Sequence, residues 1–337
     1  MVSIQNQDIK EFVNNFEYSN RFAGKTICIT GATGLIGSIL AKCLLSFNEN
    51  VQVFCPVRNK EKANVIFGKL ANKMVLVEEN MDEFFKNTDV AFDYVIHCAS
   101  PTSGVYMKEH PVETYNFIMG STNVILDYAE RKHPAGVVYV SSLEYYGQVL
   151  EDRLINEDDM GYVDPTDARS SYPLGKRAAE YLCVSYAKEY GVPVKIARLA
   201  QTFGAGVSKD DNRMFAQFAR SIINGDDIVL HTTGESAKPY CYTIDCVIAI
   251  LYILLKGENG EAYNVANQET YISVKDLAVF LRNNFNPNID VRVEEHPEMG
   301  YAPVTKLRLS THKLEKLGWK PRYNLLQMFC RLIDSMK

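Results

Sequence analysis

The chain has 337 residues, of which 47% are hydrophobic and 23% are charged, and its formal net charge at pH 7 is −5. A chain of this length can bury a large core, as one domain or two. The mildly acidic balance and the scattered basic residues argue against nucleic acid as the main partner. No apolar run approaches the ~20 residues of a membrane-spanning helix, so we expect no membrane partner.

The eight cysteines are dispersed and form neither a C-x-x-C motif nor a Cys/His cluster at metal spacing. This usage is typical of reduced cysteines, so we expect a cytoplasmic protein without a bound metal. The first 24 residues are polar and lack the apolar stretch of a signal peptide. We expect them to form a short amphipathic lead-in helix ahead of the first strand.

Short apolar runs rich in β-branched residues alternate with helical patterns along the chain. This alternation predicts an α/β fold, a doubly wound parallel sheet (Rossmann) with helices on both faces. Ligands of such sheets collect beyond the C-terminal ends of the strands. The predicted strands cover residues 25–30, 51–57, 74–77, 94–97, 137–141, 194–199, 228–230 and 262–265.

A glycine-rich turn, GATGLIG, follows the first predicted strand and opens a predicted helix over 37–46. In this context Gly31 would make the tight turn, Gly34 would let the backbone approach a pyrophosphate, and Gly37 would allow close packing of helix on strand. The helix N-terminus would attract the phosphates. The predicted dinucleotide-binding residues here are Gly31, Thr33, Gly34, Leu35, Ile36 and Gly37.

The periodicity becomes less regular after residue 204, which favours a smaller C-terminal α/β substrate lobe over the cleft. We expect a polar turn over 234–239, an apolar helix over 242–255, and helices capped by Ser273 and by Ser310, the latter ending at Gly318. The predicted divisions are a lead-in over 1–24, a dinucleotide-binding domain over 25–203 with a return segment at about 241–266, and a substrate lobe over 204–240 and 267–337.

Tyr172 and Lys176 lie one turn apart on a helix predicted to run to about residue 190, and therefore share a face. A free phenol titrates near ~10. A neighbouring ammonium would favour the phenolate and bring the pKa of Tyr172 toward neutrality, where acid–base catalysis is efficient. The spacing alone is a weak signal, since such pairs are common on helix surfaces.

Further motifs strengthen the signal from Tyr172 and Lys176. They are TGATGLIG at 30–37, HCASP at 97–101, SSLEYYG at 141–147, SYPLGK at 171–176, ARLAQTFG at 197–204 and LSTHKLEKLGWKP at 309–321. In the order and spacing of these motifs the chain resembles the extended short-chain dehydrogenase/reductases that modify nucleotide sugars, and in parts it is similar to the GDP-mannose dehydratase and UDP-glucuronate decarboxylase subgroups. The resemblance implies a nicotinamide cofactor, a nucleotide-diphosphate sugar substrate, and Tyr172 as the acid/base.

The resemblance also assigns roles to other residues. Ser142 would bond the reacting hydroxyl, and Lys176 would bond the nicotinamide ribose. Glu144 stands where dehydratases and decarboxylases carry a glutamate, which in a dehydratase removes the C5 proton. Leu143 replaces the acidic partner of dTDP-glucose dehydratases, although GDP-mannose dehydratases lack that acid too. The remaining cofactor candidates are Ala99, Ser100 and Ser141.

The predicted substrate-binding residues are Ser103, Gln201, Arg213, Lys238 and Arg308. Gln201 replaces the family's usual asparagine. Lys238 replaces the arginine that holds substrate in decarboxylases. A lysine cannot form the bidentate hydrogen bonds that an arginine forms with a carboxylate or phosphate. Decarboxylation therefore ranks low, and the three cations remain candidates for the diphosphate, with plain surface charge as the alternative.

The second predicted strand ends in Val57-Arg58-Asn59, with no acidic residue to bond the ribose of NAD. Arg58 could instead accept a 2′-phosphate, so we favour NADP over NAD.

The predicted function is an epimerase or 4,6-dehydratase that recycles its cofactor within one turnover. One alternative is an NADPH-dependent reductase of a nucleotide-linked keto sugar or ketose. A minor alternative is an inactive cofactor-binding regulator, which the intact Ser142, Tyr172 and Lys176 disfavour. The family often dimerises through the helices predicted over 111–131 and 172–190, so a homodimer is expected.

Overall fold

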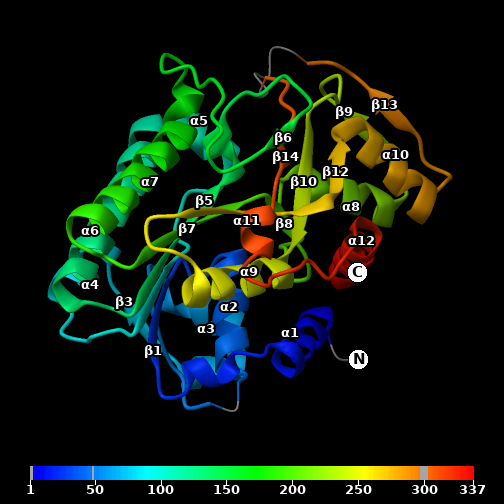
Figure 1. The fold of residues 1–337 in the computed structure, drawn as a ribbon. Helices are drawn as coiled ribbons and strands as arrows, with labels where there is room; N and C mark the ends of the chain where they lie inside the picture. The colour runs from blue at the N-terminus through cyan, green and yellow to red at the C-terminus, as the bar shows by residue number, and fades with distance from the viewer. Residues whose placement is uncertain (1–2, 48, 297–302) are drawn as a thin grey trace.

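The computed structural model describes residues 3–47, 49–296 and 303–337, and its centre is a seven-stranded parallel sheet (Figure 1). The strand order is β11-β7-β5-β4-β1-β2-β3. This is the doubly wound α/β architecture that the alternating pattern predicted. The strands are β1 (Thr26–Thr30), β2 (Gln52–Val57), β3 (Val75–Glu78), β4 (Tyr94–His97), β5 (Gly136–Ser142), β7 (Val194–Leu199) and β11 (Ala262–Val265).

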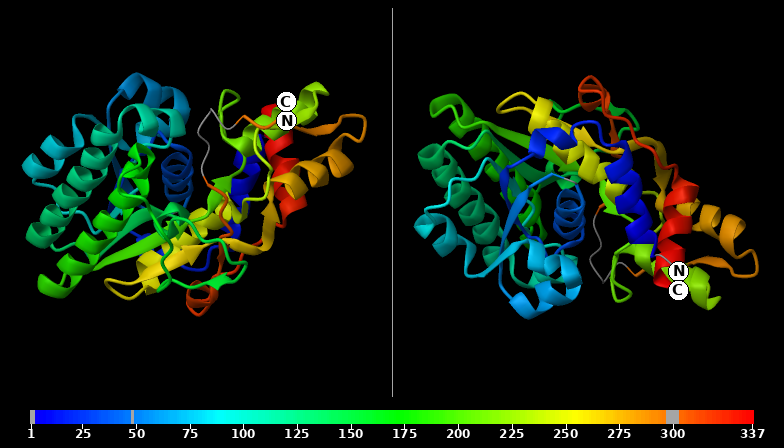
Figure 2. Two further views of the ribbon diagram at one scale, coloured as in Figure 1. Left: turned by 90° about the horizontal axis from the view of Figure 1, so that it is seen from above. Right: turned by 90° about the horizontal axis from the view of Figure 1, so that it is seen from below.

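Helices cover both faces of this sheet, which explains why its strands are continuous apolar runs (Figures 1 and 2). One face carries α2 (Leu35–Leu45), α3 (Lys60–Phe67) and α9 (Thr243–Lys256). The other carries α4 (Met81–Asn87), α6 (Pro111–Lys132) and α7 (Ser171–Glu189). Shorter elements in this half are α5 (Gly104–Glu109) and the 3₁₀ turns η1 (Ser19–Phe22), η2 (Gly68–Lys73), η3 (Leu143–Tyr146) and η4 (Ala168–Ser170).

In the described residues, smaller sheets and further helices lie beyond the C-terminal edge of the large sheet, and α11 (His312–Glu315) lies alongside the edge strand β11 (Figure 1). The sheets pair β12 (Asn267–Ser273) with β10 (Ala237–Tyr242) and β8 (Gln201–Phe203), β13 (Val291–Val293) with β9 (Ile228–Leu230), and β14 (Arg308–Leu309) with β6 (Leu154–Ile155). The helices beyond the edge are α8 (Met214–Asn224), α10 (Val274–Phe285) and α12 (Leu325–Met336).

Two local expectations for this region are wrong. The turn predicted over 234–239 is in part the strand β10, whose Pro239 lies where the pairing register shifts between Lys238 and Tyr240. A proline is tolerated in a strand at such an irregularity. Ser310 does not cap the next helix, because α11 begins after Thr311 and has no side-chain cap. Ser273, in contrast, accepts a hydrogen bond from Asp276 N at 3.0 Å, as a cap should.

The expected lead-in helix is α1 (Ile4–Asn15), which packs against α2, α9 and α12 (Figure 2). Gln5 accepts a hydrogen bond from Lys42 of α2 at 2.7 Å. Arg331 of α12 forms ion pairs with Asp8 and Glu11 of α1. Helices α1 and α12 are thus joined to each other, and α1 is joined to α2 of the large-sheet layer.

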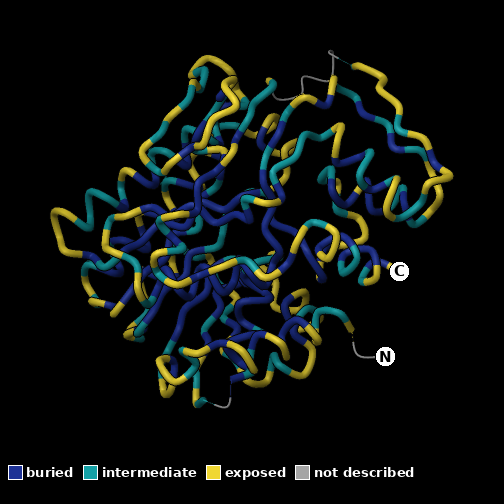
Figure 3. Tube along the Cα trace, turned by 45° about the vertical axis from the view of Figure 1, so that its right-hand side comes forward, coloured by how far each residue is buried: buried dark blue, intermediate teal, exposed yellow. Residues whose placement is uncertain are grey.

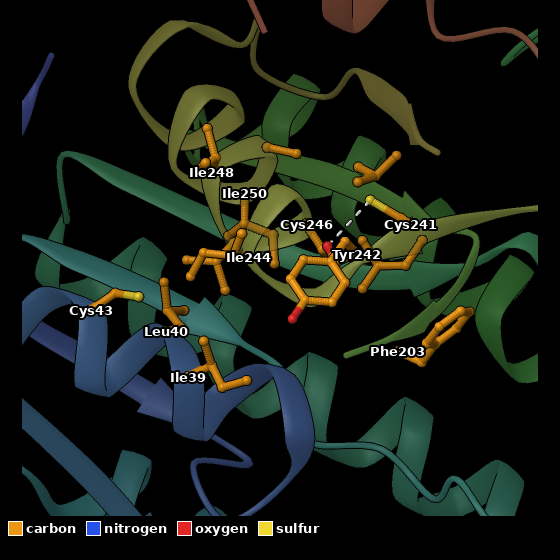
Figure 4. Packing of buried hydrophobic residues seen from close by; sticks show 14 of the residues in the cluster. Ile39, Leu40, Cys43, Phe203, Cys241, Tyr242, Ile244, Cys246, Ile248 and Ile250 are labelled. Carbon is orange, nitrogen blue, oxygen red and sulfur yellow. Dashed lines mark hydrogen bonds between the residues drawn. The ribbon is translucent and has the colours of Figure 1, made fainter. Parts of the chain in front are cut away.

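The main core lies between the large sheet and α2 and α9, and it continues into the smaller sheets (Figure 3). Figure 4 shows Ile39 and Leu40 of α2 beside Ile244 of α9. The helix α9 is apolar on nearly every side and buried along almost its whole length. It has only 14 residues, and none of the helices in the described residues is long and apolar enough to cross a membrane.

Asp245 is a buried polar residue on the largely apolar helix α9. It holds the segment that follows α11 through hydrogen bonds. Its Oδ2 accepts backbone hydrogen bonds from Arg322 at 2.9 Å and Tyr323 at 3.2 Å, and its backbone carbonyl accepts from the Trp319 indole at 3.0 Å. No counter-ion neutralises this carboxylate within hydrogen-bonding range among the described residues. Burial therefore raises the pKa of Asp245 to about 7, although the two backbone bonds oppose the rise.

Asp245→Asn is expected to flatten the dependence of stability on pH. A carboxyl whose pKa is raised on folding contributes stability that is complete below its unfolded pKa and is lost as the pH rises through the folded pKa. Between pH 5 and pH 8 the parent should lose about 2–3 kcal/mol more unfolding free energy than Asp245→Asn. Urea unfolding at both pH values measures this, and parallel losses in the two proteins would contradict the assignment.

Candidate active site

The glycine turn lies between β1 and α2, and two of its glycines are required by close backbone contacts. Gly31 has φ +66°, and a Cβ there would lie 2.6 Å from Ala99 N. A Cβ on Gly37 would lie 2.5 Å from Gly31 O. No side chain caps α2 at Gly34, so the N–H groups of Leu35 and Ile36 in its first turn remain available for an anion.

The segment after β4 lies against this turn and is held by a buried hydrogen-bond chain. The Thr30 hydroxyl is 2.7 Å from His97 Nδ1, and His97 Nε2 is 3.2 Å from Ser121 of α6. Thr30 also accepts from Ala99 N at 3.3 Å. Burial, with a smaller contribution from the charge of Lys176, lowers the pKa of His97 to about 3. His97 is therefore neutral and joins β1, β4 and α6.

Lys176 is the most buried charged group at the site, with 1% of its surface exposed. Its ammonium donates to Val140 O at 3.0 Å and lies 4.8 Å from the centroid of the Tyr139 ring. Burial lowers the pKa of Lys176 to about 8, and the charge of Glu180 opposes that fall. The ammonium also lies 5.6 Å from the centroid of the Tyr172 ring. Helix α7 thus brings Tyr172 and Lys176 to the end of β5.

The pKa of Tyr172 differs from the expected one. Burial and the charge of Glu144 raise it above its ordinary value, and the hydroxyls of Ser142 and Ser100 only partly oppose the rise. Tyr172 is therefore a neutral phenol in the protein alone. The expectation that Lys176 would bring this pKa toward neutrality is wrong for this state, because burial of Tyr172 has the largest effect on it and Lys176 is not among the main groups that shift it.

Ser142 ends β5, and Glu144 follows it in the turn η3. The Ser142 hydroxyl accepts from Glu144 N at 3.2 Å, which fixes the start of that turn. The Glu144 side chain is exposed, and its charge affects the pKa values of Tyr172, Lys176 and Lys238. The structure therefore brings together the four predicted catalytic residues.

The predicted substrate residues occupy different surroundings. Arg213 is held by Asp211 through two guanidinium nitrogens, with a shortest distance of 2.6 Å, and Arg308 lies over the Tyr271 ring with Asp152 beside it at 3.7 Å. Lys238 forms no ion pair among the described residues, and burial lowers its pKa while Glu144 opposes the fall. Ser103 caps α5 by accepting from Tyr106 N at 3.3 Å, and Gln201 begins β8.

The hydroxyls of two further cofactor candidates, Ser141 and Ser100, differ in whether they already have a hydrogen-bond partner inside the protein. The Ser141 hydroxyl donates to Glu180 at 2.5 Å, so its side chain has a partner inside the protein. The Ser100 hydroxyl oxygen is buried and makes no hydrogen bond of ordinary geometry with any described residue. Arg58 is exposed at the end of β2. The sequence pointed to His97 only as part of the HCASP motif, and nothing in it indicated a role for Glu180 or Arg198.

The sequence model of the NAD dependent epimerase/dehydratase family matches residues 27–266, which is most of the chain. The chain belongs to that family. It is accordingly an enzyme of the kind that the motifs predicted, and the expected Rossmann fold is confirmed by its solved structural neighbours.

Relatives and neighbours cover nearly the whole chain. UDP-glucuronic acid decarboxylase 5 of Arabidopsis thaliana is 28% identical over 309 residues, which are 89% of this chain and 85% of the relative. A dTDP-glucose 4,6-dehydratase from Streptomyces venezuelae with NAD bound has TM-score 0.76 and 18% identity, covering 92% of this chain and 96% of that one. A UDP-glucuronic acid 4-epimerase from Bacillus cereus with NAD has TM-score 0.76 and 19% identity, covering 92% and 98%.

The family implies a dinucleotide, and the residues present fit one. The uncapped start of α2 offers backbone N–H donors for phosphates, and the buried Ser100 hydroxyl beside Tyr172 has an unused hydrogen-bonding capacity. Within the described ranges, no group of three or more His, Cys, Asp or Glu side chains is placed to hold a metal ion.

Gly31→Ala is expected to reduce both stability and dinucleotide affinity, because the new Cβ would press on the backbone of Ala99. Gly225→Ala is the control, since Gly225 also has positive φ, +79°, and lies in the left-handed helical region, but a Cβ there would meet only Asn286 Nδ2 at 3.9 Å. The left-handed conformation costs the control about 1–2 kcal/mol, and Gly31→Ala adds the clash to the cost of its own positive φ. Thermal unfolding and NADP titration measure the difference, and equal effects in the two variants would contradict the close approach.

Proposed function

We propose that the protein is an NAD(P)-dependent enzyme that modifies a nucleotide-diphosphate sugar by hydride transfer at a sugar hydroxyl or ketone carbon, in the manner of an epimerase or 4,6-dehydratase. The observation that carries this proposal is the gathering of Ser142, Tyr172 and Lys176 at the C-terminal end of β5, beyond the same sheet edge as the Gly31 turn. The names of the relatives, which specify UDP- and dTDP-linked sugars, support the substrate class.

In this proposal Tyr172 exchanges a proton with the reacting sugar hydroxyl, and Ser142 bonds the same hydroxyl. A bound nicotinamide would supply the hydride acceptor or donor. Because burial keeps Tyr172 protonated in the protein alone, positive charge has to collect beside it before it can act as a base. Lys176 provides one such charge, and its place one turn from Tyr172 lets it also bond the cofactor ribose.

Glu144 supports the dehydratase form of this chemistry. Its carboxylate is exposed and lies in the turn that directly follows Ser142, close enough to influence both Tyr172 and Lys238. Such a group can remove the proton next to a sugar ketone. Lys238, which has no carboxylate partner among the described residues, is the cation best placed to bind substrate beside it.

Arg58 favours a second candidate, an NADPH-dependent reductase of a nucleotide-linked keto sugar or ketose. Its side chain is exposed where β2 ends, at the position from which a dinucleotide fold reads the adenosine ribose. The two candidates differ in cofactor balance. Net loss of reduced nicotinamide absorbance with a keto substrate supports the reductase, and turnover with no net change supports internal recycling.

We further infer a homodimer in the cytoplasm. Apolar side chains are exposed on the packed pair α6 and α7, including Val112 at 64% and Tyr181 at 72%. Exposed apolar patches mark interfaces, and all eight cysteines are free thiols, as in reducing compartments. Light scattering tests the oligomeric state, and a monomer at working concentration contradicts this inference.

Tyr172→Phe is expected to lower the turnover rate about 10²–10⁴-fold, because the variant keeps the ring but loses the exchangeable proton. Tyr190→Phe is the matched control, since Tyr190 is half exposed at the end of the same helix. Steady-state rates with the sugar nucleotide that gives activity measure both variants. An unchanged rate for Tyr172→Phe would remove this residue from the chemistry.

Arg58→Ala is expected to abolish a preference for NADPH over NADH that the parent should show, because the guanidinium is the group that would bind the 2′-phosphate. Lys62→Ala is the control, as an exposed cation on the adjoining helix α3. Fluorescence titration with both reduced cofactors gives the affinities. Equal affinities in the parent would refute the assignment of NADP.

A further inference from the structure

A buried ion pair lies one turn behind Lys176. Glu180 and Arg198 are 3% and 4% exposed. The Arg198 guanidinium donates to both Glu180 oxygens, from Nη2 to Oε2 at 2.8 Å and from Nε to Oε1 at 3.1 Å. Glu180 follows Lys176 by four residues on α7, so Tyr172, Lys176 and Glu180 share one face of the helix. The face that carries the predicted chemistry therefore continues into a buried carboxylate.

The same carboxylate also holds the end of β5. Glu180 accepts from the Ser141 hydroxyl at 2.5 Å, and Ser141 immediately precedes Ser142. The Lys176 ammonium donates to Val140 O on the same strand. Two successive turns of α7 thus fasten the strand at positions next to the predicted catalytic serine.

Arg198 extends this attachment to the chain that follows Ser142. Its guanidinium stacks on the Tyr145 ring at 3.5 Å from the centroid and donates to the Tyr146 hydroxyl at 3.0 Å and to Glu157 O at 2.6 Å. Tyr146 in turn donates to Asn264 of β11 at 2.7 Å. The turn that carries Glu144 is consequently fixed to α7 and to two strands of the large sheet.

Resting on the function proposed above, we propose that Glu180, clamped by Arg198 and Ser141, is a positioning residue that keeps Lys176 an ammonium and fixes the strand end carrying Ser142. A buried lysine loses its charge unless an opposite charge lies near it, and Glu180 is the strongest such influence on Lys176. Arg198 holds the carboxylate in place. It is not among the main groups that affect the titration of Lys176.

Other groups face Lys176 and have to be held constant in any test. They come from its own helix, from the ends of β4 and β5, and from the turn η3. They are Tyr172, Cys183, His97, Cys98, Tyr139 and Glu144.

Glu180→Gln tests the proposal because it keeps the size and an acceptor oxygen but removes the charge. The pKa of Lys176 should fall by about one pH unit or more. It is read by NMR from the ¹³Cε resonance of Lys176 in the free protein, which is assigned as the lysine signal that disappears in Lys176→Met. Arg177→Met is the matched control. Arg177 bonds Tyr145 O at 2.7 Å and Gly161 O at 2.8 Å, so it supports the same chain segment without touching Glu180, and this variant should leave the Lys176 titration unchanged.

The double variant Glu180→Gln/Arg198→Met keeps the test decisive if the lone Arg198 charge prevents folding, because replacing both members of a buried pair is better tolerated than removing one. The pKa of Lys176 should fall in this double variant as well. The proposal is overturned if Lys176 titrates in the variant that folds as it does in the parent. Since this titration needs neither cofactor nor substrate, it is independent of whether the proposed reaction is found. In active protein, the apparent pKa of the alkaline limb in the pH profile of kcat/KM should fall together with the pKa of Lys176.

Discussion

An ammonium held almost entirely away from water is the constraint on which the rest of the site depends. An unpaired buried charge is very costly, so Lys176 requires its carbonyl, aromatic and carboxylate neighbours, and these neighbours come from β5 and α7. Their arrangement fixes the helix against the strand end. Because Ser142 and Tyr172 belong to the same two elements, satisfying one buried charge also sets the mutual position of the predicted catalytic hydroxyls.

The second constraint is the close contact between the loop that follows β1 and the loop that follows β4. Gly31 touches the backbone of Ala99, and the Thr30–His97–Ser121 chain holds that contact from behind. Since β1, β4 and β5 are parallel neighbours in the sheet, their C-terminal ends lie side by side at one edge. The glycine turn and the Tyr172 phenol are therefore brought to the same edge by strand order rather than by direct contact.

The sequence was most informative where one rule decides the structure. Buried parallel strands leave continuous apolar runs, so the strands of the large sheet were predicted to within a residue or two, and the glycine turn was predicted because only glycine permits its contacts. The sequence predicted a turn at Lys238, because Pro239 is unusual in a strand and β10 is irregular at that position. The pKa of Tyr172 and the pairing of Glu180 with Arg198 depend on groups from separate elements, and no local pattern reports such partners.

A crystal structure with NADP bound tests the central claim most directly, namely that Tyr172 and Lys176 face the reactive end of a dinucleotide held by the Gly31 turn. The account predicts the pyrophosphate at the start of α2, Lys176 Nζ within about 3.2 Å of a nicotinamide ribose hydroxyl, and the Tyr172 hydroxyl toward the nicotinamide ring. A dinucleotide bound elsewhere, or a Tyr172 hydroxyl directed away from the ring, would contradict it.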